Sequence, residues 1–138
     1  MRNAVLIIGA GPSRLFAAAE LIRHGVEVRL VEREAAPHHE ARATTIQAGT
    51  LEILESVGLV APFIEAAEHV RCARIYSPDM SELRVTTFDG VDCRWEFQCV
   101  LPQYETKRIL ETHLVSLGGT VEREVTATRL ELDANNRP

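Results

Sequence analysis

The 138 residues suffice for about one domain with a hydrophobic core, and 46% hydrophobic with 25% charged residues is ordinary for a soluble globular protein. The net charge of −5 argues against a nucleic-acid or anionic-membrane surface, because such surfaces need a basic face. No apolar run approaches the roughly 20 residues that cross a bilayer.

The N-terminus and the cysteines favour a cytoplasmic protein. Met1–Arg2–Asn3 leads directly into a short strand-like run, which is not the pattern of a secretory signal. Cys72, Cys93 and Cys99 are odd in number and lack Cys-x-x-Cys spacing. We therefore expect reduced thiols.

The first elements in chain order predict a βαβ unit. Ala4–Ile8 is a continuous apolar run, as in a parallel strand covered on both faces. Gly9–Ser13 is a glycine-rich turn, and apolar residues recur at helical spacing from there to His24. Val26–Val31 is the next strand, closed by Glu32. A right-handed helical connection between the two strands is expected.

The middle of the chain changes character. Glu34–Thr45 is polar and predicts an irregular excursion, and Thr50–Ser56 and Val60–Glu68 predict two short helices. Three short β-rich segments separated by turn residues then predict an antiparallel β-meander. These segments are Val70–Tyr76, Leu83–Phe88 and Phe97–Leu101.

The last elements predict a further helix and two strands. Gln103–Leu117 has apolar residues on one helical face, and Thr120–Glu122 and Val125–Leu132 are strand-like. Ala134–Asn136 is a turn signal with no partner strand after it. We therefore expect residues 1–138 to form a single, partial domain.

The glycine-rich turn has the features of a pyrophosphate site. A helix N-terminus offers unpaired N–H groups and a partial positive charge. Gly9 permits the tight turn, and Gly11 lets the backbone approach the phosphates. Pro12 suits an early helical position, and Ser13 adds a hydroxyl.

Arg14 stands where the third glycine of a G-x-G-x-x-G motif is expected. Its stem would crowd the contact of helix and strand, and overpacking typically costs about 1–3 kcal/mol. The cost falls if the stem runs along the surface, and the guanidinium could instead donate to the pyrophosphate. We expect a weakened site rather than an excluded one.

Glu32 supplies an acidic residue near the expected position, roughly 20 residues after the turn. A carboxylate there accepts hydrogen bonds from ribose hydroxyls and repels a 2′-phosphate. The alternative is a generic βαβ unit with a solvated Glu32. We favour an adenosine-containing dinucleotide, although these features alone do not separate NAD from FAD.

Three separated motifs extend this interpretation. They are GAGPS-x-L followed by Val31–Glu32, RATTIQ-x-x-TLEIL over Arg42–Leu54, and VLPQ-x-x-TKRIL-E over Val100–Glu111. Together they resemble the class A flavoprotein monooxygenases of the para-hydroxybenzoate hydroxylase type, in their phenol- and polyketide-hydroxylase-like branch. The resemblance implies an α/β fold. It would be a Rossmann-like βαβ FAD-binding domain of the glutathione reductase-like superfamily with an antiparallel β-meander, incomplete at the C-terminus.

The resemblance also implies roles for individual residues. Arg42 and Gln47 would lie along the FAD, Gln103 would reach its flavin side, and the backbone of Val125 would contact the adenine. The other cofactor-binding candidates are Gly9, Gly11, Pro12, Ser13, Glu32 and Arg33. Arg42 as a surface ion-pair partner, and Gln47 and Gln103 as polar residues at helix starts, are the structural alternatives.

The resemblance further implies a reaction. The family's flavin is reduced by NAD(P)H, reacts with O₂ and passes one oxygen to a small aromatic substrate. No residue of this chain is a credible catalytic acid or base. A metal site at His38–His39–Glu40 is not expected, because adjacent loop residues point apart.

Departures from the family pattern leave alternatives open. Arg14 replaces a glycine and Ala48–Gly49 replaces a Pro-Arg pair. We also expect these residues to lack the substrate domain and the later flavin-binding segments. We hypothesise that the chain alone does not hydroxylate a substrate. The alternatives are a truncated or degenerate non-catalytic module, and another FAD-dependent oxidoreductase such as a reductase or amine oxidase. The sequence leaves the oligomeric state open.

Overall fold

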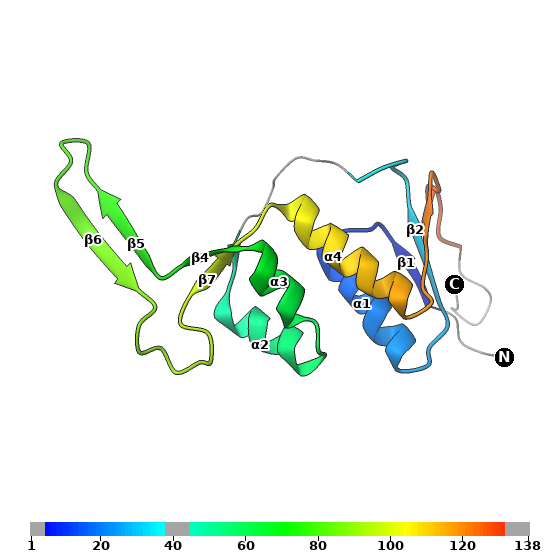
Figure 1. The fold of residues 1–138 in the computed structure, drawn as a ribbon. Helices are drawn as coiled ribbons and strands as arrows, with labels where there is room; N and C mark the ends of the chain where they lie inside the picture. The colour runs from blue at the N-terminus through cyan, green and yellow to red at the C-terminus, as the bar shows by residue number, and fades with distance from the viewer. Residues whose placement is uncertain (1–4, 38–44, 132–138) are drawn as a thin grey trace. The chain divides into compact units, whose positions relative to one another are not determined.

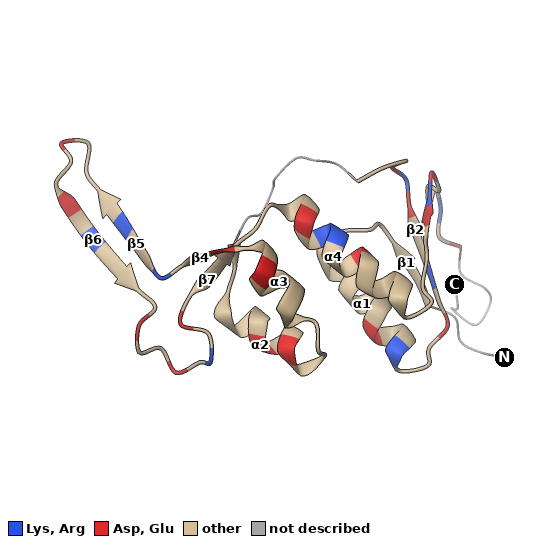
Figure 2. Ribbon diagram, viewed as in Figure 1, with Lys and Arg blue, Asp and Glu red and all other residues tan. Residues whose placement is uncertain are grey.

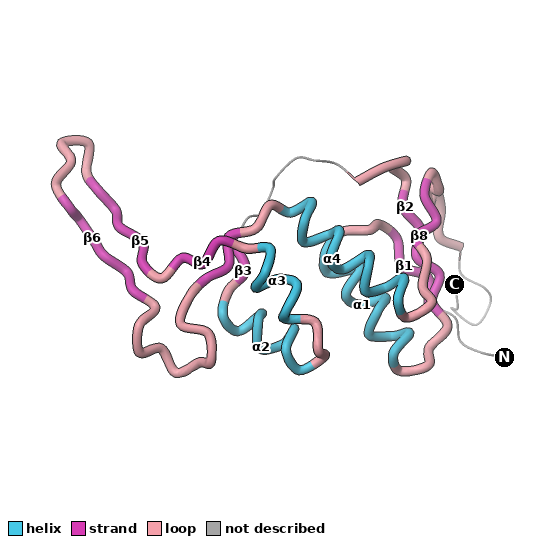
Figure 3. Tube along the Cα trace, in the orientation of Figure 1, coloured by secondary structure: helices cyan, strands magenta, loops and turns pink. Residues whose placement is uncertain are grey.

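The computed structural model describes residues 5–37 and 45–131. The chain divides into two compact units, and Figures 1 and 3 show the helices and strands. The first takes in Met1–His39 and Leu110–Pro138, and the second is Glu40–Ile109.

The first unit contains a three-stranded parallel sheet. Its strands are β1 (Val5–Ile8), β2 (Val28–Glu32) and β8 (Val121–Arg123), in the order β1-β2-β8. Ile7 lies opposite Leu30, which in turn lies opposite Val121. Helix α1 (Pro12–Arg23) connects β1 to β2 (Figure 1). The predicted βαβ unit is therefore confirmed.

Small apolar side chains let α1 lie close to this sheet. Leu15, Ala18 and Ala19 are fully buried on one face of the helix. Gly119 allows a second close approach: a Cβ there would lie 2.6 Å from Leu114 Cδ1 and 2.7 Å from Ile22 Cδ1. The C-terminal half of α4 (Gln103–Ser116) therefore meets α1 at a point where only glycine fits.

One expectation for β1 is wrong. A strand covered on both faces was predicted, yet Leu6 and Ile8 are 55% and 52% exposed. Successive side chains of a strand point to opposite faces. Within the described residues, only one face of β1 is covered.

The second unit combines two helices with two antiparallel sheets. Its helices are α2 (Ala48–Ser56) and α3 (Val60–Ala66), and the first residues of α4 also belong to it. One sheet has the order β3-β7-β4, from β3 (Thr45–Ile46), β7 (Gln98–Val100) and β4 (Glu68–Val70). The other is the hairpin of β5 (Cys72–Tyr76) and β6 (Glu82–Thr87).

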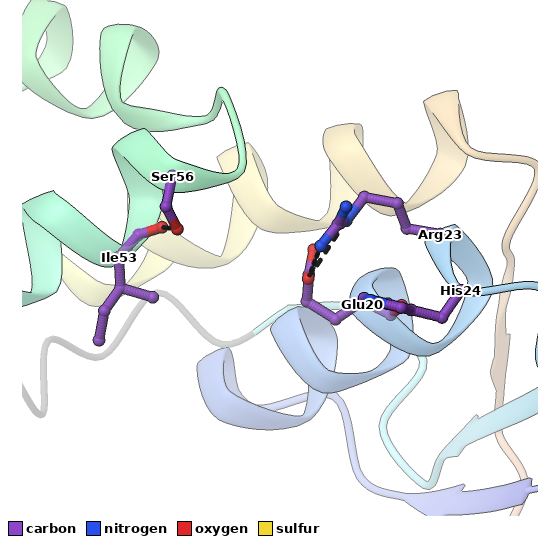
Figure 4. A network of polar contacts seen from close by, with 5 residues as sticks. All are labelled: Glu20, Arg23, His24, Ile53 and Ser56. Carbon is purple, nitrogen blue, oxygen red and sulfur yellow. Dashed lines mark hydrogen bonds and ion pairs between the residues drawn. The ribbon is translucent and has the colours of Figure 1, made fainter.

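The core of this unit includes side chains from helices and strands. Phe63, Leu51, Cys99 and Leu101 are almost completely buried. At the C-terminal end of α2, the Ser56 hydroxyl donates to the Ile53 carbonyl at 2.7 Å (Figure 4). This bond satisfies one of the carbonyls that a helix end leaves without an intrahelical partner.

The antiparallel pairing was predicted, but its connections differ from a consecutive meander. The predicted strand Val70–Tyr76 is interrupted at Arg71, so β4 and β5 lie in different sheets. Strand β7 pairs with β3 and β4, not with β6. Thr45, assigned to the irregular excursion, instead begins the two-residue strand β3.

The predicted strand Val125–Leu132 is also wrong over its described part. Residues 125–131 form no strand, because β8 ends at Arg123 and Glu124 has a φ of +62°. A left-handed residue breaks the pleat of an extended chain. The expected turn at Ala134–Asn136 lies outside the described residues.

Candidate functional site

The glycine turn joins the end of β1 to the start of α1. Gly9 has a φ of +98°, which favours glycine, and its N–H donates to Val31 O at 2.7 Å. Gly11 is the N-cap and Pro12 is the first helical residue. The cap carries no side-chain hydrogen bond, and the first turn of α1 has no acidic residue. This helix N-terminus therefore retains its positive potential.

Glu32 ties the end of β2 to this turn. Its Oε2 accepts a hydrogen bond from the Ala10 N–H at 2.6 Å, across 22 residues of sequence. Oε1 accepts from the Glu34 N–H at 3.2 Å. The backbone carbonyl of Glu32 accepts from the Val125 N–H at 3.0 Å. The structure thus brings together the glycine turn, Glu32 and the Val125 backbone. That they share a cofactor site stays a prediction.

The role of Ala10 was missed by the sequence analysis. Ala10 is 1% exposed, so its N–H needs a partner within the protein. The G-x-G motif leaves the residue between its glycines unspecified, so it does not predict a hydrogen bond at Ala10. The carboxylate at the end of β2 was the available signal, since it needs donors of its own.

Arg14 does not lie where the sequence predicted crowding. The residue is exposed, while the buried helix–sheet contact is made by Leu15, Ala18 and Ala19. Arg14 Nη1 lies 3.0 Å from the position that a Cβ on Gly9 would occupy, and 3.7 Å from the corresponding position on Gly11. Its stem follows the surface and its head covers the turn, so the expected overpacking is avoided.

The charged side chains nearby are mostly paired. Arg29 donates from Nε and Nη2 to the two oxygens of Glu122, at 2.9 and 2.8 Å, and these bonds lower the pKa of the Glu122 carboxyl. Arg123 Nη2 contacts both oxygens of Glu111. Arg33, a predicted cofactor-binding residue, is exposed and paired with Glu34 at 3.0 Å. Along the ribbon, basic residues are interspersed with acidic ones (Figure 2).

Helix α1 also ends with a paired cation. Arg23 Nη2 lies 2.6 Å from Glu20 Oε2, and this bond lowers the pKa of the Glu20 carboxyl (Figure 4). His24 Nδ1 lies 2.7 Å from the Glu20 carbonyl oxygen. A cation at a helix C-terminus is favourable, whereas Arg14 occupies the opposite end.

Two predicted residues lie in the second unit. Gln47 is the exposed N-cap of α2, and its Oε1 accepts from Gln98 Nε2 at 2.5 Å. Gln103 is the half-buried first residue of α4. Gln98 was not identified from the sequence, since a single glutamine in a short strand gives no distinguishing pattern. Arg42 and the His38–His39–Glu40 segment lie outside the described residues.

Two other kinds of site were sought in the part of the chain that the structure describes. It holds no group of three or more metal-ligating side chains. None of the helices in this part is long and apolar enough to span a membrane.

The parallel βαβ unit, the glycine turn and the carboxylate at the end of β2 define a dinucleotide-binding domain. The sequence matches the model of a family described as FAD binding domain over residues 2–137. The chain therefore belongs to the FAD binding domain family.

The chain is also similar to proteins that are named as monooxygenases or hydroxylases. It is 32% identical over 111 residues to pentachlorophenol 4-monooxygenase of Sphingobium chlorophenolicum, covering 80% of this chain and 21% of that protein. The structure of the OxyS anhydrotetracycline hydroxylase from Streptomyces rimosus matches with a TM-score of 0.82 and 32% identity, covering 97% of this chain and 26% of OxyS. PieE, solved in complex with FAD and substrate, matches with a TM-score of 0.79 and 26% identity, over 96% and 25% of the two chains. The chain thus spans about a quarter of the length of these relatives.

Proposed function

We propose that this chain binds FAD through the glycine turn and the end of β2. The observation that carries the proposal is the 2.6 Å hydrogen bond from the Ala10 N–H to Glu32, which fixes a carboxylate beside the N-terminus of α1. Gly9, Gly11, Pro12 and Ser13 would hold the pyrophosphate. Glu32, with Arg33 beside it, would hold the adenosine ribose, and the Val125 backbone would lie at the adenine.

The donors and acceptors present fit such a group. The first turn of α1 offers backbone N–H groups without a side-chain cap, which suit phosphate oxygens. The Glu32 carboxylate accepts hydrogen bonds from backbone amides, and ribose hydroxyls are donors of the kind that a carboxylate accepts. Both ends of an adenosine diphosphate moiety therefore find groups of matching chemistry.

Gln47 and Gln103 are proposed to contact other parts of the cofactor, on the strength of their places in the RATTIQ and VLPQ motifs. Gln47 and Gln103 can each donate and accept, which suits the hydroxyl groups of a ribityl chain. The bond from Gln98 orients the Gln47 amide so that its nitrogen stays available to an acceptor. Arg42 is proposed to act alongside them, on the strength of its place in the RATTIQ motif.

For the whole protein, we propose hydroxylation of a phenolic or other small aromatic substrate with NAD(P)H and O₂. The names of the relatives support this reaction class. Bound flavin would supply the redox and oxygen chemistry, while this chain's residues bind and orient it. The net charge of −5 argues against a nucleic-acid-binding surface. We propose a cytoplasmic enzyme that acts on small molecules.

A second candidate is a degenerate module that keeps the fold without binding the cofactor. Arg14 is the observation that favours it, because the guanidinium covers the turn that phosphates would approach. In that case Arg14→Gly would bind FAD and the natural chain would not.

Titration of FAD with the purified chain tests the proposal. Flavin fluorescence anisotropy should rise to saturation at one FAD per chain, and NAD⁺ should compete weakly. Preferential binding of NAD⁺, or no binding of FAD by the natural chain, would contradict it. NAD(P)H-dependent product formation from a phenol by this chain alone would contradict the hypothesis that the isolated chain is inactive.

A further inference from the structure

The guanidinium of Arg14 occupies the space that two glycines leave open. Nη1 lies 3.0 Å from the position of a Cβ on Gly9, and Cδ and Cζ each lie 3.4 Å from it. These three Arg14 atoms are the nearest to that position, and Nη1 is also within 3.7 Å of the corresponding position on Gly11. The side chain therefore turns back from α1 over the loop that precedes the helix.

The charge of Arg14 is not balanced by an ion pair within the described residues. None of the ion pairs among the described residues involves Arg14. It lies in the first turn of α1, where the helix dipole disfavours a cation and where no acidic residue balances it. By contrast, Arg23 at the other end of the same helix is paired with Glu20. The Glu32 carboxylate is held at the same turn by the Ala10 N–H, but Arg14 itself takes part in none of these ion pairs. A cation of this kind at a positive helix end favours an anionic ligand.

We propose that Arg14 is itself a pyrophosphate-binding residue, which supplies a cation where a third glycine would supply only space. This inference rests on the proposed FAD binding and adds a ligand to it. The side chain is exposed and carries several rotatable bonds, so its head can swing outward as phosphates reach the turn. The guanidinium can then donate two parallel N–H bonds to phosphate oxygens.

This proposal and the view of Arg14 as an obstruction predict opposite changes in ligand affinity when Arg14 is replaced. If Arg14 donates to the pyrophosphate, its removal weakens the binding of FAD and of ADP alike, because both carry that group. If Arg14 merely blocks the turn, its removal strengthens both. In that case the arginine at the third glycine position lowers the affinity of the site.

Three substitutions and one control separate these cases. Arg14→Gln removes the charge while keeping a long side chain, Arg14→Lys keeps the charge without the planar donors, and Arg14→Gly restores the usual motif. Arg23→Gln removes the same charge from the opposite end of α1. Dissociation constants for FAD come from fluorescence anisotropy, those for ADP come from competition, and thermal melts verify that each variant folds.

Arg14→Gln should bind both ligands about tenfold more weakly, since one charge-assisted interaction is lost at an exposed site. Arg14→Lys should fall between, and Arg23→Gln should match the natural chain. Raising the salt concentration should weaken FAD binding by the natural chain more than FAD binding by Arg14→Gln, because salt screens the charge of Arg14. Equal or tighter binding by folded Arg14→Gln and Arg14→Gly would overturn the proposal while leaving FAD binding intact. A natural chain that binds neither ligand would instead overturn the proposed function, and this inference with it.

Discussion

The hydrogen bond between Ala10 and Glu32 makes a measurable prediction about stability. Glu32→Ala removes the acceptor of a backbone N–H in a residue that is 1% exposed. A buried donor left without a partner costs about 1–3 kcal/mol. With a urea m-value of about 2 kcal/mol per M, the unfolding midpoint should fall by roughly 0.5–1.5 M.

Urea denaturation followed by far-UV circular dichroism measures this shift. Glu32→Gln should lose less than Glu32→Ala, because its amide oxygen still accepts one bond, although without charge assistance. Glu27→Ala is the matched control: it removes the same charge from an exposed side chain just before β2 and should change stability by less than about 0.5 kcal/mol. Equal midpoints for Glu32→Ala and Glu27→Ala would refute the reasoning.

Three further predictions concern other parts of the chain. Gly119→Ala should lower the free energy of unfolding by about 1–3 kcal/mol, because its Cβ would lie 2.6 Å from a neighbouring methyl carbon. A Cβ on Gly49 in α2 would have no atom within 4 Å, so Gly49→Ala should raise the free energy of unfolding by about 0.5–1 kcal/mol. Equal unfolding midpoints for Gly119→Ala and Gly49→Ala would contradict the packing described. Hydrogen bonds from two serines lower the pKa of Asp79 in the β5–β6 turn to about 2. The ionised Asp79 carboxylate therefore adds to stability above pH 3.8, and this contribution is lost as the pH falls toward 2. An NMR titration of Asp79 with a midpoint near 3.8 would disprove this. Burial raises the pKa of the Cys99 thiol, so a thiol reagent at neutral pH should label exposed Cys72 quickly and Cys99 only on unfolding, and equal labelling rates would count against the buried core.

Local patterns explain why the βαβ part of the first unit was predicted well. The apolar run before Gly9, the helical spacing after it and the acidic end of the second strand each depend on neighbours in sequence. Together they define β1, α1 and β2 and their parallel pairing. The position of Glu32 opposite the turn follows from that pairing, because the carboxyl ends of parallel strands meet at one edge of the sheet.

The pairing of the second unit could not be obtained in the same way. Strand β7 pairs with β3, more than fifty residues earlier, and β3 has only two residues. Strands this short carry too little alternation to be recognised. Likewise, the break after Arg123 depends on one left-handed residue, Glu124, that no glycine or asparagine announces.

Arg14 shows a different limit of sequence analysis. Its place in the motif predicted crowding, but whether a long side chain turns into the helix–strand contact or over the surface depends on its rotamer. The structure shows the second arrangement. The effect of Arg14 on FAD binding therefore depends on its charge beside the phosphates, and not on crowding between helix and strand.

The most direct test of FAD binding at the glycine turn is an amide NMR spectrum of the chain during addition of FAD. The account predicts that the largest shifts fall on the amides of Ala10, Gly11, Ser13 and Arg14, and on Glu32 at the end of β2. Addition of ADP should reproduce the shifts at the turn. An unchanged spectrum, or shifts confined to residues far from the turn and from Glu32, would contradict the account.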